Sequence, residues 1–187
     1  MDREEALKFV ESKVTNQNIL KHMLATEAVM RGLSRKFESN KEKTWALAGL
    51  LHDGDYKIDV PVEKQGILIT QWVRQEKQIT LPASVTHAMA SHNPKTGVKP
   101  ESKMDWALFA CDSLTGLIIA STLVLPCRKI NDLTIESVLK RFKEPKFAKG
   151  TRREDILEGT KHLEISLELF VKISLQAMKD ISESLGL

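Results

Sequence analysis

Cysteine is scarce in this sequence, with only Cys111 and Cys127 among 187 residues. Neither belongs to a CxxC pair or stands beside a histidine, which excludes the usual zinc-finger and thiol-redox motifs. We therefore expect both residues to be buried thiols in a reducing cytoplasm.

Long apolar runs and a strong net charge are also missing. The longest uncharged stretch, residues 113–127, has 15 residues, fewer than the roughly 20 that a membrane span needs, so it predicts a buried helix. The charged first residues, MDREEALKFVESK, lack the apolar core of a signal peptide. A net charge of +3 is too small to indicate nucleic-acid binding. These absences predict a cytoplasmic protein that acts away from membranes and nucleic acids.

Strict alternation of apolar and polar residues over strand length is hard to find, whereas apolar residues recur at helical spacing almost throughout. The pattern predicts an all-α protein with one domain, a size that 187 residues readily fill. Prolines and one turn-rich loop separate the expected helices. These lie near residues 2–13, 17–38, 43–53, 61–76, 82–91, 103–125, 132–142 and 154–185, the last of them continuous or broken in two.

Two helix boundaries have specific signals. Ser102 and Asp105 have the spacing of a capping box at the start of the longest apolar helix. At the end of the chain, one apolar stripe predicts a core helix that ends at Gly186. Its members follow each other at steps of three and four: Leu163, Leu167, Phe170, Ser174, Met178, Ile181 and Leu185.

The stretch WALAGLLHDGDYK, residues 45–57, places a histidine and three charges at the end of an apolar helix. Asp112 is a second anomaly, because an ionised carboxylate in a buried helix needs a partner, a proton or a metal. No lysine or arginine lies between Lys103 and Arg128, which favours a partner of Asp112 that is distant in sequence. A divalent metal held by His22, His52, Asp53 and Asp112 would explain four placements at once.

Each of these residues also has an ordinary explanation. A lone histidine is more often a hydrogen-bonded core or surface residue than a ligand. Asp53 and Asp55 could simply close a turn, and Asp112 could bond a distant hydroxyl. Four independent explanations would then be needed, which favours the metal.

The same residues resemble the HD superfamily of metal-dependent phosphohydrolases. The resemblance rests on a histidine in an early helix, a His-Asp doublet after a later apolar helix, and an aspartate further on, here His22, His52-Asp53 and Asp112. The text AGLLHDGDYK, SHNP and ALFACDSLTGLI looks like one group of small HD-domain proteins. The resemblance runs from about residue 19 to the end of the chain.

This resemblance implies one HD domain over residues 1–187, with a metal-binding core at about 19–125 and C-terminal helices at 132–187. It implies one divalent ion, for which manganese, iron, cobalt, nickel and zinc all suit two imidazoles and two carboxylates. It also implies hydrolysis of a phosphate ester, because such an ion polarises phosphoryl oxygens and lowers the pKa of bound water toward about 7. Many HD proteins hold a second metal with a further histidine, where this chain has Gln65-Gly66.

Other residues are candidates for catalysis or phosphate binding. Asp55 is expected to act as general acid or base, although a turn role is at least as plausible for it. His92 is expected to line the catalytic pocket or to bind phosphate. His87 lies five positions earlier, about 140° around a helix, and is expected to be structural.

Basic residues could neutralise a phosphate, and Lys57, Lys103 and Arg128 are the single candidates. Residues 140–153 form a run rich in basic side chains. Such a run is usually a solvated surface, with a substrate role as the alternative. Its members are Lys140, Arg141, Lys143, Lys146, Lys149, Arg152 and Arg153, and His162 beyond it is expected to face solvent.

The leading hypothesis is therefore a hydrolase of a small phosphorylated metabolite or nucleotide. One alternative is a catalytically weak HD-fold module that binds or senses a nucleotide. Another is a purely structural metal whose coordination positions are all closed. The sequence names neither the substrate nor the oligomeric state, and a homo-oligomer stays open.

Overall fold

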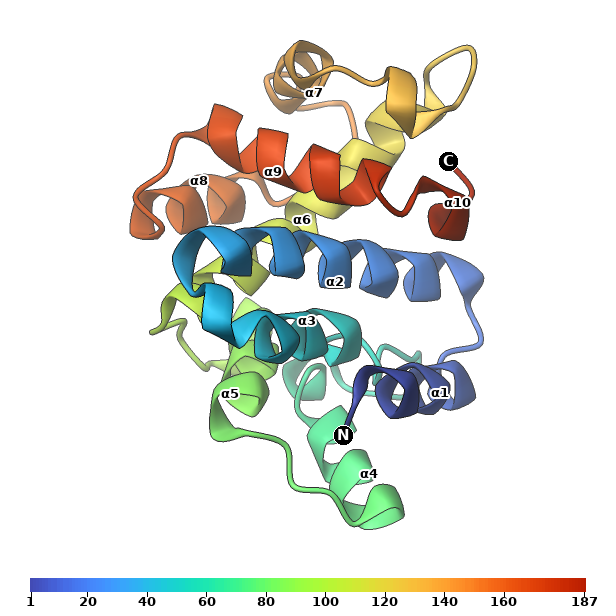
Figure 1. Cartoon of the computed structure of the whole chain (residues 1–187), viewed down its shortest axis with the longest axis vertical. Coiled ribbons are helices and arrows are strands. Elements are labelled where there is room, and N and C mark those ends of the chain that lie inside the picture. The colour runs from blue at the N-terminus through green and yellow to red at the C-terminus, as the bar shows by residue number, and fades with distance from the viewer.

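The computed structural model describes residues 1–187 and is built from helices alone (Figure 1), which confirms the all-α prediction. Ten α-helices are joined by turns and by four short 3-10 helices. The α-helices are α1 (Arg3–Lys13), α2 (Gln17–Phe37), α3 (Glu42–Leu51), α4 (Leu68–Lys77), α5 (Ala83–Ser91), α6 (Lys103–Leu123), α7 (Ile135–Phe142), α8 (Arg153–His162), α9 (Leu167–Lys179) and α10 (Ser182–Leu185). The 3-10 helices are η1 (Ser39–Lys41), η2 (Val62–Lys64), η3 (Pro94–Thr96) and η4 (Ile130–Asp132).

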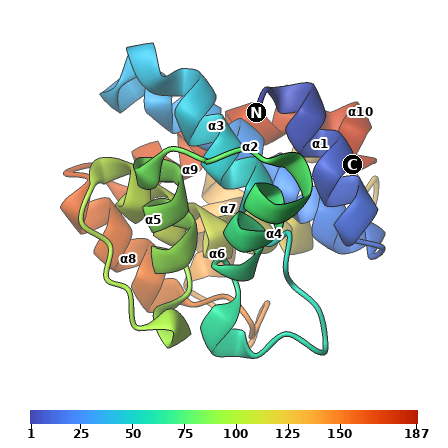
Figure 2. The same ribbon diagram turned by 90° about the horizontal axis from the view of Figure 1, so that it is seen from below.

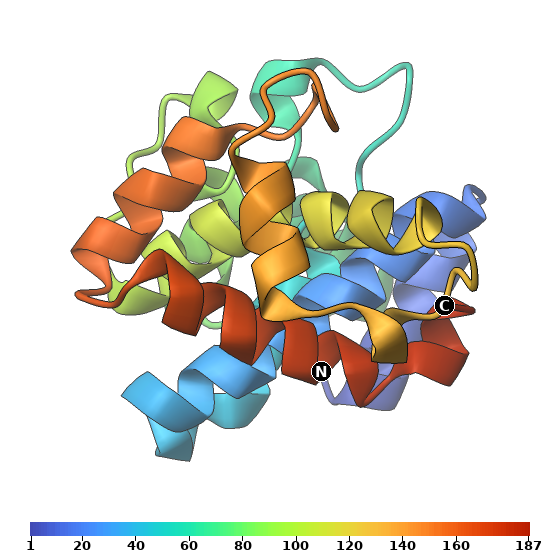
Figure 3. The same cartoon turned by 90° about the horizontal axis from the view of Figure 1, so that it is seen from above.

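Helix α2 crosses the middle of the molecule and packs against α3, α6 and α9 (Figure 1). The end of the molecule that carries α4 and α5 faces the viewer in Figure 2, and the opposite end, with α7 and α9, faces the viewer in Figure 3. Helices from both halves of the chain therefore meet around α2 and α6. This arrangement brings residues that are far apart in sequence into one core.

Helix α6 is the central apolar helix of the fold. It begins with the predicted capping box, in which the side chains of Ser102 and Asp105 each accept a backbone N–H of the other residue. It is the one helix with the length and mean hydropathy, 1.5, of a membrane span, but 67% of that window is buried inside the protein. Its apolar surface is thus covered largely by neighbouring helices, as expected for a core helix.

The uncharged stretch 113–127 leaves the core before it ends. Helix α6 stops at Leu123, and Leu123 and Val124 are about half exposed, at 49% and 53%. Cys111 is buried, whereas Cys127 is exposed. The expectation of two buried thiols is therefore wrong for Cys127, because the turn that follows α6 carries it to the surface.

Two predicted helices are interrupted in the structure. The segment 61–76 forms η2 and then a turn, and α4 begins only at Leu68. The turn contains Gly66 with φ of 84°, a conformation that favours glycine and ends regular helix. Apolar spacing alone did not reveal this turn.

The C-terminal segment 154–185 is broken twice, into α8, α9 and α10. Glu164 has φ of 56° after α8, and Ser166 then caps α9 by accepting the N–H of Leu169. The predicted apolar stripe still faces inward, since Phe170, Ser174 and Met178 are buried. Gly186 ends α10 as predicted, with φ of 68°.

Candidate metal centre

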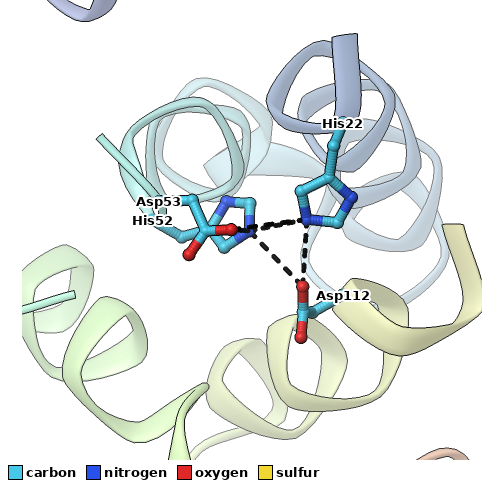
Figure 4. A group of neighbouring side chains, drawn as sticks. All are labelled: His22, His52, Asp53 and Asp112. Carbon is cyan, nitrogen blue, oxygen red and sulfur yellow. Dashed lines mark hydrogen bonds and ion pairs between the residues drawn. The ribbon is translucent and has the colours of Figure 1, made fainter. Parts of the chain in front are cut away.

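Two histidines and two aspartates from three parts of the chain converge in the core (Figure 4). His22 comes from α2, His52 and Asp53 follow α3, and Asp112 comes from α6. One nitrogen or oxygen atom of each residue lies within 4.8 Å of the others. These four residues, which the sequence predicted as metal ligands, are called the cluster below, and they could hold a metal ion.

The spacing of these atoms suits a first-row divalent ion. His22 Nε2 lies 3.2 Å from His52 Nε2 and 3.0 Å from Asp112 Oδ1. Asp53 Oδ2 lies 3.7 Å from the first imidazole nitrogen and 3.6 Å from the second. Ligand atoms about 2.1 Å from a common ion lie about 3.0 Å apart in octahedral and about 3.4 Å apart in tetrahedral geometry. The distances from the two imidazole nitrogens to each other and to the two carboxylate oxygens, 3.0 to 3.7 Å, are close to these separations.

A glycine lets α3 approach α2 closely enough to form the cluster. A Cβ atom at Gly49 would lie 2.9 Å from the carbonyl oxygen of Thr26 and 3.0 Å from the backbone nitrogen of Glu27. A side chain there would push the two helices apart. Because His52 is three residues beyond Gly49 and His22 lies one turn before Thr26, this contact brings the two imidazoles together.

Hydrogen bonds orient both imidazoles so that Nε2 faces the centre. His52 Nδ1 lies 2.8 Å from the carbonyl oxygen of Gly49, which can only accept. His22 Nδ1 lies 3.1 Å from the hydroxyl of Thr115, and that hydroxyl donates to the carbonyl of Asp112 at 2.9 Å. Each Nδ1 therefore carries its proton away from the centre, which leaves the Nε2 lone pair for a metal.

Asp112 has the distant partner that its own helix lacks. Arg152, at the start of α8, donates from Nη2 to Asp112 Oδ2 at 2.9 Å, across 40 residues of sequence. The other oxygen, Oδ1, faces the two imidazoles. The prediction of a long-range partner for Asp112 is confirmed, although no sequence signal distinguishes Arg152 from the rest of the basic run 140–153.

His92 lies beside the cluster and extends it. It follows α5, and its Nδ1 lies 2.5 Å from the carbonyl oxygen of Met89, so this imidazole also directs Nε2 inward. The Nε2 atom lies 3.4 Å from Asp53 Oδ1, the carboxylate oxygen that faces away from His22 and His52. Asp53 is thus held between imidazoles on both sides.

The surroundings favour the ionised form of both aspartates. Burial alone would raise the pKa of Asp53 and of Asp112, but the imidazoles outweigh it and lower both values, that of Asp112 strongly. Burial would lower the pKa of His92, but the facing Asp53 carboxylate outweighs it and the net shift is upward. The centre therefore presents two carboxylate charges at neutral pH, which a divalent cation would balance.

Asp55, the residue expected to act as general acid or base, lies in the turn after α3. It is fully buried, and its two oxygens accept the backbone N–H groups of Gly66 and Ile69 at 2.8 and 2.9 Å. Burial raises the pKa of this carboxyl, while the two N–H groups oppose that shift. These contacts give Asp55 a structural role in joining the turn after α3 to the start of α4, and its role in proton transfer stays a prediction.

Replacing Asp55 separates these two roles. We expect Asp55→Ala to lower the free energy of unfolding by roughly 2–5 kcal/mol, because two buried N–H groups lose their acceptors. Urea unfolding of the metal-free chain measures this, with Asp59→Ala in the same turn as the exposed control. Unchanged stability together with a large loss of activity would instead identify Asp55 as a proton-transfer residue.

The three single cations predicted to bind phosphate lie apart from one another. The Lys57 ammonium lies 5.1 Å from the ring centroid of Trp72, and that of Lys103 lies 5.4 Å from the ring centroid of Phe37. Arg128 is an exposed residue in the turn after α6, with φ of 52°. None of them bonds to a residue of the cluster, so their phosphate-binding roles stay predictions.

The other two histidines lie outside the cluster. His87 Nδ1 lies 2.9 Å from Asp105 Oδ2, the same oxygen that accepts N–H groups at the start of α6. His162 is exposed, as predicted, and stacks on Trp106 with ring centroids 3.7 Å apart. Neither residue hydrogen-bonds to the four converging side chains.

Comparison of the chain with protein-family models, with curated proteins and with solved structures finds no match in any of the three. Any function of this chain must therefore be inferred from the geometry and chemistry of the centre.

Proposed function

We propose that this chain is a metal-dependent hydrolase of a phosphate ester, with the HD-type arrangement that its motifs resemble. The observation that carries the proposal is the convergence of two Nε2 atoms and two carboxylate oxygens at distances that a divalent ion requires. Both imidazoles have their Nδ1 protons directed elsewhere. When bound, the ion would polarise a phosphoryl oxygen and lower the pKa of a coordinated water.

The residues around the metal ligands have roles in the proposed reaction. When protonated, His92 would donate from Nε2 to Asp53 Oδ1 and so orient that carboxylate. Arg152 orients Asp112 at the edge of the centre. The substrate is a small phosphorylated molecule, and the reaction takes place in the cytoplasm.

The limited access to the centre favours a second candidate, a binding module with a structural metal. The His52 side chain is fully buried, and those of His22, Asp53 and Asp112 are 12–16% exposed. A structural site has all its coordination positions closed, whereas a catalytic site keeps one open. Turnover by the metal-loaded chain distinguishes the two candidates.

The test is phosphate release by the chain loaded in turn with manganese, iron, cobalt, nickel or zinc. The substrates are p-nitrophenyl phosphate and nucleoside mono-, di- and triphosphates. We expect His52→Gln to reduce turnover by about 100-fold or more, while His162→Gln, an exposed histidine away from the centre, leaves it unchanged. Full metal loading without turnover of any substrate would favour the binding module, and equal turnover by the His52 variant would contradict the proposed site.

A further inference from the structure

The Asp112 carboxylate divides its two oxygens between the metal centre and Arg152. Oδ1 lies 3.0 Å from His22 Nε2, and Oδ2 accepts a hydrogen bond of 2.9 Å from Arg152 Nη2. One carboxylate therefore links the centre directly to a guanidinium. No other arginine or lysine bonds to a residue of the cluster.

The guanidinium of Arg152 is held in place but keeps unused donors. Its Nε donates to Asp155 in the first turn of α8, while its Nη1 bonds to no other protein group. The side chain is 43% exposed. Two N–H bonds of Nη1 and one of Nη2 are thus free at the edge of the centre, where solvent or a ligand can reach the side chain.

The backbone that carries Arg152 is anchored by the next residue. Arg153 donates to the carbonyl oxygens of Phe142, Glu144 and Phe147 at 2.7 to 2.9 Å, which ties the loop between α7 and α8 together. The two neighbouring arginines therefore differ in use. Arg153 uses its donors on backbone carbonyl oxygens of the loop, whereas Arg152 is held in position and has free N–H groups that could bind a further anion.

The charges around the centre indicate what the free N–H groups of Arg152 could bind. The two ionised aspartates would neutralise a divalent ion, and Asp155 offsets part of the Arg152 charge. A phosphate arriving at the ion brings additional negative oxygens that need hydrogen-bond donors. Arginine suits this task because its planar group of N–H donors binds two oxygens at once.

We propose that Arg152 is the phosphate-binding residue of the centre and that its free Nη donors hold the phosphoryl group of the substrate. This inference rests on the proposed function. It selects Arg152 from the basic run 140–153, whose members cannot be distinguished by composition alone. Arg152 keeps its bond to Asp112 while its remaining donors bind a non-bridging oxygen. It is thus a substrate-binding residue as well as a neighbour of a metal ligand.

The test measures binding of inorganic phosphate by calorimetry to the full chain, after metal content has been determined for each variant. We expect Arg152→Gln to keep its metal and to raise the Kd for phosphate by about 10- to 100-fold, as loss of a charged hydrogen bond predicts. Arg152→Lys should recover part of the affinity, because lysine keeps the charge without the planar donors. Lys149→Gln removes an exposed charge from the same loop and should change the Kd by less than about twofold.

Several outcomes would overturn the inference. Equal phosphate affinity of the wild type and the R152Q variant would exclude a binding role for the guanidinium. Loss of metal from R152Q would show that Arg152 serves to orient Asp112, and a metal-loaded wild type that binds no phosphate would also refute the inference. A wild type that takes up no metal is a separate result, seen before phosphate is added, and it refutes the proposed function together with this extension of it.

Discussion

Replacing Asp53 with alanine should reduce the bound metal from about one ion per chain to almost none. The carboxylate supplies an oxygen within 3.7 Å of both imidazole nitrogens of the cluster. Apart from Asp112, no other carboxylate belongs to the converging group, so a lost oxygen cannot be replaced from nearby. Elemental analysis of protein purified without chelator measures this effect directly.

The matched control for this experiment is Asp59→Ala. Asp59 is an exposed carboxylate six positions further along the same loop, so its removal changes the net charge equally. We expect this variant to keep the wild-type metal content. Equal metal content in the folded Asp53 and Asp59 variants would contradict the site.

Thermal unfolding gives a second readout of the same site. A ligand that binds only the folded chain raises its stability by RT ln(1 + [L]/Kd), about 2.7 kcal/mol at 100 times the Kd. Adding the metal should therefore raise the Tm of the wild type and of the Asp59 variant. The Tm of the Asp53 variant should stay unchanged, because it has lost the site.

The sequence predicts the helices better than their interruptions. Apolar periodicity reports which face of a segment is buried, and the stripe through Phe170, Ser174 and Met178 is buried as expected. The same stripe continues across the breaks at Glu164 and Ile181, because the flanking helices pack on the same core. Periodicity is therefore preserved where the backbone turns, and only the backbone angle and the Ser166 cap mark the break.

Three of the four cluster residues were predictable because they are unusual in their local sequence, whereas His22 was predicted only as a residue that completes the metal site. Asp112 is a carboxylate in an apolar helix, and His52-Asp53 ends another. Arg152 has no such signal, since it lies in an exposed basic run 40 residues from its partner. The contact of Arg152 with Asp112 depends on the packing of α8 beside α6, which no local sequence pattern encodes.

Gly66 is a position where the structure predicts a large loss of stability. Its φ is 84°, and a Cβ atom there would lie 2.2 Å from the carbonyl oxygen of Met89 and 3.0 Å from the His92 ring. Met89 and His92 lie at the end of α5, and the Gly66 N–H bonds to Asp55. We expect Gly66→Ala to lower the free energy of unfolding by roughly 2–4 kcal/mol, from steric overlap and backbone strain together.

Gly97→Ala separates the two contributions, because Gly97 has a similar φ of 78° and no atom within 4 Å of an added Cβ. Its cost should be about 1 kcal/mol, the strain of the left-handed conformation alone. Urea unfolding of both variants measures the difference, and equal losses would show that the contact with Met89 relaxes freely. If the contact instead displaces α5, the imidazole of His92 moves away from Asp53, so the Gly66 variant should also bind metal more weakly than the Gly97 variant.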